Sequence, residues 1–74
     1  MKQSHHLIAF FKNAREVICA ERLLRSEGVT VEIIPVPEKY SSECGMCIRI
    51  PSNQKELFSE TVQKEGYSPI VIEE

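Results

Sequence analysis

Apolar residues occur in four short runs, separated by two stretches in which they recur three and four positions apart. The runs are rich in Ile, Val and Phe and are bounded by polar residues, Gly or Pro, as is typical of β-strands. They cover residues 6–11, 29–34, 46–50 and 67–72. The helical spacing, as in Val17, Ala20 and Leu24, predicts one helix between Asn13 and Gly28 and another between Asn53 and Gly66.

Both predicted helices have the same boundary signals. Asn13 and Asn53 each precede a Glu by three residues, the spacing of a capping box in which the first residue caps the helix and the Glu reaches back to it. Gly28 and Gly66 follow the last helical positions, where a glycine commonly ends a helix. The chain therefore repeats one strand-helix-strand unit.

Two such units with right-handed crossovers most economically form a ferredoxin-like βαββαβ fold. We expect an α+β two-layer sandwich, with a four-stranded antiparallel sheet and two helices on one face. A single domain should span residues 1–74, because two hydrophobic cores need a longer chain. Pro69 indicates that the last strand lies at an edge of the sheet.

Composition narrows the classes of function. Apolar residues make up 42% and charged residues 27% of the chain, with a formal net charge of −2. These values indicate a globular domain and give no broad positive field for nucleic acid. The apolar runs are far shorter than the roughly 20 residues of a membrane span. The first residues lack a secretory signal, so we expect a cytoplasmic protein with no membrane partner.

The predicted topology places the loop 38–45 at the start of the first helix. The first two strands are parallel, so the loop after the second should lie at the same end of the sheet as Asn13, Ala14 and Arg15. The N-terminus of a helix carries partial positive charge and unpaired N–H groups. Cys44 is therefore expected near an electropositive helix end, with these three residues as candidate binding residues.

The segment Cys44-Gly45-Met46-Cys47 is the most specific local motif. A helix N-terminus and nearby basic side chains favour the thiolate, the form that attacks sulfur. Gly45 allows a sharp turn, and Ser41 and Ser42 could donate hydroxyl hydrogen bonds to an anionic adduct on Cys44. Cys44 is the candidate carrier thiol, and Cys47 is the candidate second thiol.

The number and spacing of the cysteines also bear on disulfide, zinc and copper sites. The chain has three cysteines, an odd number that argues against a disulfide scaffold. Zinc would need four ligands, so we expect no metal site formed by one chain, and no cofactor is implied. Copper-chaperone domains share this element order, but their cysteines follow the first strand. Cys19 is interpreted as an exposed cysteine of the first helix.

The segment from Pro37 through the Ser-Ser-Glu-Cys-Gly stretch to Ile50 resembles the small bacterial selenium/sulfur carrier protein-like family. The resemblance covers nearly the whole chain, and Tyr40 and Cys47 depart from the family pattern. It implies a carrier rather than an enzyme. Cys44 would accept sulfur or selenium from a donor such as a cysteine desulfurase and pass it to an acceptor enzyme.

The sequence leaves two alternatives open. The first is a dithiol redox or transient metal-handling protein that uses Cys44 and Cys47. The second is a small regulatory or partner-docking module with inert cysteines. A homodimer through the open sheet face is also an expectation.

Overall fold

The computed structural model describes residues 5–40 and 45–73, and its elements follow the order that the sequence predicts. A short 3-10 turn, η1, precedes the second helix. The bounds are β1 His6–Phe10, α1 Ala14–Ser26, β2 Glu32–Pro35, β3 Met46–Pro51, η1 Ser52–Gln54, α2 Lys55–Lys64 and β4 Ile70–Glu73.

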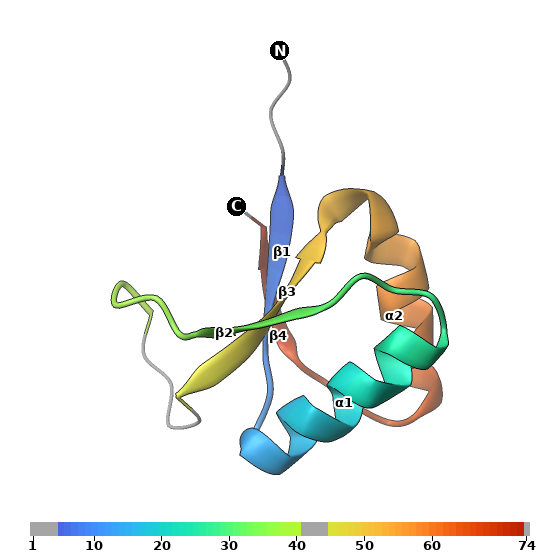
Figure 1. Cartoon of the computed structure of the whole chain (residues 1–74), viewed down its shortest axis with the longest axis horizontal. Helices are drawn as coiled ribbons and strands as arrows, with labels where there is room; N and C mark the ends of the chain where they lie inside the picture. Colours follow the sequence, from blue (N-terminus) through green and yellow to red (C-terminus); the bar gives the residue numbers. More distant parts are fainter. Residues whose placement is uncertain (1–4, 41–44, 74) are drawn as a thin grey trace.

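The strands form one antiparallel sheet in the order β2-β3-β1-β4, and both helices cover the same face of it (Figure 1). This arrangement confirms the ferredoxin-like α+β sandwich and the edge position of β4. The register pairs Pro35 with Met46, Ala9 with Ile48 and Phe10 with Ile70. β1 and β2 therefore end where β3 and β4 begin. We call this the loop end of the sheet.

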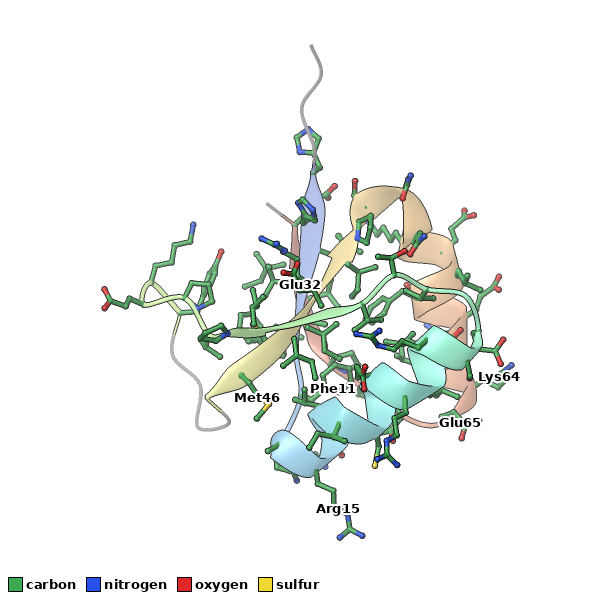
Figure 2. All side chains as sticks on the ribbon, viewed as in Figure 1. Phe11, Arg15, Glu32, Met46, Lys64 and Glu65 are labelled. Atoms are coloured by element: carbon green, nitrogen blue, oxygen red, sulfur yellow. The ribbon has the colours of Figure 1, made fainter. Side chains whose placement is uncertain are left out.

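The core fills the space between the sheet and the helices. Because side chains alternate along a strand, Ala9 and Phe11 point to the helices while Ile8 and Phe10 point to the opposite, open face. Figure 2 shows Phe11 between the sheet and α1. The buried core residues are Ala9, Phe11, Val17, Ala20, Leu24, Val29, Val31, Ile48, Ile50, Phe58 and Val62, with Met46 and Tyr67 packed against them.

Both helices end as the sequence predicts, in Schellman motifs. Gly28 has a φ of 92°, and the N–H of Val29 donates to the Leu24 carbonyl at 2.9 Å. In α2, the N–H of Tyr67 donates to the Val62 carbonyl at 2.9 Å, again after a glycine with positive φ. This geometry pairs carbonyls that the helix end leaves without intrahelical partners, and it needs the left-handed glycine. Tyr67 is thereby held at the helix end, so β4 begins later than predicted.

The start of α1 confirms the predicted cap with one difference. The Asn13 side chain accepts a hydrogen bond from the Glu16 N–H at 2.9 Å. The Glu16 carboxylate, however, accepts from the N–H of Lys12 at 3.4 Å and not from that of Asn13. The reciprocal bond has moved one residue upstream, and it joins the end of β1 to the helix.

The predicted cap of α2 is wrong. Asn53 lies within η1, and the residue at the N-cap position is Gln54, whose side chain makes no capping bond. Gln54 instead accepts from the Thr30 N–H at 2.7 Å. Next to Thr30, the Val31 carbonyl accepts from the Arg25 guanidinium at 3.2 Å. The backbone groups of Thr30 and Val31 are therefore hydrogen-bonded to side chains. β2 begins at Glu32 instead of Val29.

Asn13→Ala should lower the free energy of unfolding by about 1 kcal/mol, because it leaves a helix N–H without its cap. Asn53→Ala is the matched control and should change it by less than about 0.5 kcal/mol, since Asn53 is exposed and caps nothing. Urea unfolding of both variants measures the difference. Equal losses would contradict the assignment of the caps.

Candidate functional site

The loop end of the sheet brings together the start of α1 and the loop that joins β2 to β3. The loop closes at its base, where the Val36 N–H donates to the Gly45 carbonyl at 3.3 Å. Gly45 itself has a φ of 81°, a left-handed conformation that other residues rarely adopt. The predicted sharp turn is therefore present, and the binding role of Gly45 stays a prediction.

The described part of the loop lies on the open-face side of the sheet, opposite the helices (Figure 1). Within it, the Tyr40 N–H donates to the Pro37 carbonyl at 3.0 Å, which forms a turn. The Tyr40 ring meets Phe10 edge to face, with 5.4 Å between ring centroids. The Lys39 ammonium lies 5.4 Å from the centroid of the Tyr40 ring. Because Phe10 faces away from the core, this aromatic contact anchors the loop to the open face.

A hollow of about 320 Å³ lies beneath this contact and is mostly apolar. Its lining residues are Phe10, Phe11, Lys12, Tyr40, Ser68, Ile70 and Ile72. Lys12, Tyr40 and Ser68 are the lining residues whose side chains carry polar groups. Sequence reasoning missed the hollow. The signal was the period of two, which puts Phe10, Ile70 and Ile72 on one face once their strands pair.

Several predicted site residues lie outside the described residues. These are Ser41, Ser42 and Cys44, so the carrier thiol and its neighbouring hydroxyls stay predictions. The residues on both sides of them are described. Tyr40 contacts β1, and Gly45 leads directly into β3.

The start of α1 is at the loop end, as predicted. Asn13 and Arg15 are exposed, and Ala14 is half-buried. Figure 2 shows the Arg15 side chain pointing away from the sheet. Lys12, by contrast, lines the hollow together with Tyr40. Of these two basic residues, Lys12 is therefore the one that the structure brings next to the loop.

Cys47 is fully buried in β3, on the open-face side and opposite Ile34. Its thiol donates to the Pro35 carbonyl at 4.0 Å. A thiol in this position is not accessible to a partner protein. Its role as a second thiol stays a prediction. Next to it, Met46 packs against the core as expected.

Cys19 is exposed on α1 and lies on the helix side of the molecule. It contributes to the electrostatic surroundings of Tyr67. The Tyr67 ring meets the Phe11 ring edge to face, with 5.8 Å between the ring centroids. Burial raises the pKa of the Tyr67 hydroxyl, and Cys19, Glu16 and Glu65 raise it further through like charge. Cys19 therefore lies in a different part of the molecule from the described residues of the loop.

Among residues 5–40 and 45–73, no group of three or more His, Cys, Asp or Glu side chains could hold a metal ion. Over the same residues, no helix is long and apolar enough to cross a membrane.

Tyr40→Ala should speed the hydrogen exchange of the Val36 amide, because the loop loses its ring contact with Phe10. Tyr40→Phe is the matched control and should leave this exchange nearly unchanged, since it keeps the ring. Exchange measured by NMR on both variants checks this. An unchanged Val36 amide in Tyr40→Ala would show that the aromatic contact does not hold the base of the loop.

Comparison with known proteins agrees with the resemblance noted in the sequence. A search of the curated proteins found no match, and a search of the solved structures also found none. The model of the family described as "Putative Se/S carrier protein-like" matches residues 6–72, nearly the whole chain. The chain belongs to this Se/S carrier protein-like family.

Proposed function

We propose that the protein is a carrier that holds sulfur or selenium on Cys44, as a persulfide or its selenium analogue, and passes it to an acceptor enzyme. The observation that carries the proposal is the family match over residues 6–72. A donor such as a cysteine desulfurase would supply the sulfur. The proposal needs a reactive thiol that partner proteins can reach. Cys44, the cysteine of the Cys-Gly motif, lies in the segment between β2 and β3.

The transfer is a thiol exchange that needs no external oxidant. The Cys44 thiolate attacks the outer sulfur of a persulfide on the donor. The S–S bond of that persulfide breaks, a new S–S bond forms on Cys44, and the donor cysteine leaves as a thiolate. A thiolate of the acceptor then attacks the outer sulfur in the same way, and Cys44 is released as a thiolate.

The surroundings of the loop support this chemistry. Thiolates are favoured near helix N-termini and basic side chains. The N–H of Glu16 is taken by the Asn13 cap, which leaves the first N–H groups of α1 as donors at the loop end. Lys12 adds an ammonium group on the side where Tyr40 anchors the loop. An anionic persulfide on Cys44 would be stabilised by the same groups.

The Cys-x-x-Cys spacing motivated the alternative of a dithiol redox or metal-handling protein. In this alternative the buried Cys47 would react with Cys44 and not directly with another protein. A carrier needs one accessible thiol, so a buried Cys47 is compatible with the proposal.

Incubation with a cysteine desulfurase and cysteine should add one sulfur atom per chain, and dithiothreitol should remove it. Cys44→Ser should abolish the addition, whereas Cys19→Ser and Cys47→Ser should retain it. Intact mass spectrometry measures each result. If the wild type gains no sulfur while a known carrier loads in parallel, the carrier function is refuted. Loss of loading in Cys47→Ser would instead support the dithiol alternative.

The pKa of Cys44 should lie below the value of about 8.5 for a free cysteine, at roughly 7.5 or lower. Lys12→Gln should raise it, because it removes the ammonium beside the loop. Arg22→Gln, further along α1, should raise it much less. Alkylation by iodoacetamide against pH, in a Cys19→Ser/Cys47→Ser background, gives the midpoints. Since only the thiolate reacts, the rate should rise with pH through the pKa. Equal responses to the two substitutions would place the thiol away from Lys12.

A further inference from the structure

The loop between β2 and β3 reaches a strand that it does not connect. β2 and β3 are neighbours in the strand order β2-β3-β1-β4, so a connection between them need not approach β1. The Tyr40 ring nevertheless meets Phe10 of β1, with 5.4 Å between the ring centroids. Neighbouring strands lie about 4.8 Å apart, which puts β1 about 10 Å from β2 across the sheet. The loop is therefore drawn toward the strand that leads into α1.

Two described contacts hold this loop. At its base, the Val36 N–H donates to the Gly45 carbonyl at 3.3 Å. Further along, the two residues before Tyr40 are exposed, whereas Tyr40 is half-buried against β1. Cys44 is the last of the four residues between Tyr40 and Gly45. The ring contact therefore shortens the stretch of chain between held points to residues 41–44.

The end of this stretch next to β3 is held by backbone geometry. The φ of a residue sets the direction from which the preceding peptide unit joins it. At Gly45, φ is 81°, a value that residues with a side chain rarely adopt. A Cβ built at Gly45 would have no neighbouring atom within 4 Å, so the glycine is needed for its conformation and not for lack of room. The other end of the stretch depends on Tyr40.

Tyr40 is restrained from more than one side. Its N–H donates to the Pro37 carbonyl at 3.0 Å, which fixes its backbone in a turn. Its ring meets Phe10 at an interplanar angle of 66°, an edge-to-face arrangement that aromatic pairs prefer. The Lys39 ammonium lies 5.4 Å from the centroid of the same ring. These contacts make Tyr40 a defined anchor of the loop.

We infer that Tyr40 is a positioning residue for the transfer by Cys44, an inference that rests on the proposed function. Its contact with Phe10 holds the segment that carries the thiol toward the end of β1, where Lys12 and α1 follow. Holding a reacting group in place beforehand removes part of the entropy that its ordering would cost during the reaction. Tyr40 acts through Cys44 and need not contact the cargo.

The rate at which the full chain gains sulfur from a cysteine desulfurase and cysteine tests this role. Tyr40→Ala should load at least about threefold more slowly, because its thiol is held less firmly. Tyr40→Phe should keep most of the rate, since it keeps the ring. Ile33→Ala is the matched control and should load like the wild type, because it removes an apolar side chain that is 40% exposed on β2, outside the loop. Loading of Tyr40→Ala at the wild-type rate would overturn the inference and leave the carrier function standing.

Phe10→Leu separates positioning from a direct contact between Tyr40 and the desulfurase. If the ring contact carries the effect, Phe10→Leu should slow loading as Tyr40→Ala does. The double variant should then be no slower than Tyr40→Ala alone, because both changes remove the same contact. Urea unfolding of each variant shows that the chains compared are folded. Slowing that adds up in the double variant would mean that the two residues act independently, contrary to the inference.

Alkylation by iodoacetamide against pH tests the positioning without a donor protein. In the Cys19→Ser/Cys47→Ser background, Tyr40→Ala should move the midpoint for Cys44 upward, toward that of a free cysteine, because the thiol is held less closely to Lys12. A role of Tyr40 in stability alone would leave this midpoint unchanged. An unchanged midpoint would therefore overturn the inference. A wild type that gains no sulfur from the desulfurase would instead refute the carrier function.

Discussion

The structure depends on the period of two at the end of β1, where Phe10 and Phe11 send consecutive aromatic rings to opposite faces of the sheet. Phe11 enters the core and meets Tyr67, which the Schellman motif of α2 holds in place. Phe10 points to the open face and meets Tyr40, the residue that anchors the loop between β2 and β3. One dipeptide therefore attaches both the helical layer and the candidate site to the same strand. A slip of one residue in β1 would exchange the two rings and lose both contacts.

Most of the fold follows from the sequence because its signals are local. The repeated glycines after the helices require a left-handed backbone, and Asn13 finds its N–H three residues away. The same pattern misleads at Asn53, because the neighbouring Gln54 makes a contact with Thr30 that is distant in sequence. The Asn-x-x-Glu pattern is local, so it does not show a contact between residues as distant in sequence as Gln54 and Thr30.

The candidate site was predictable in part for the same reason. Topology places the loop at the end of the sheet where α1 begins, and the structure has it there. Topology does not say on which face the loop lies, and that is decided by the ring contact of Tyr40 with Phe10. On this side of the sheet Lys12 lines the hollow together with Tyr40, whereas the Arg15 side chain points away from the sheet. Cys47 is also buried, which the Cys-x-x-Cys spacing alone does not show.

A carrier that uses Cys44 alone should hold its cargo at a single position. Tandem mass spectrometry of the loaded, alkylated wild type locates that position most directly, because fragmentation between Gly45 and Met46 separates the two cysteines of the motif. The account predicts that the added sulfur or selenium lies on Cys44 alone. Cargo on Cys47, or spread over Cys19 as well, would contradict it.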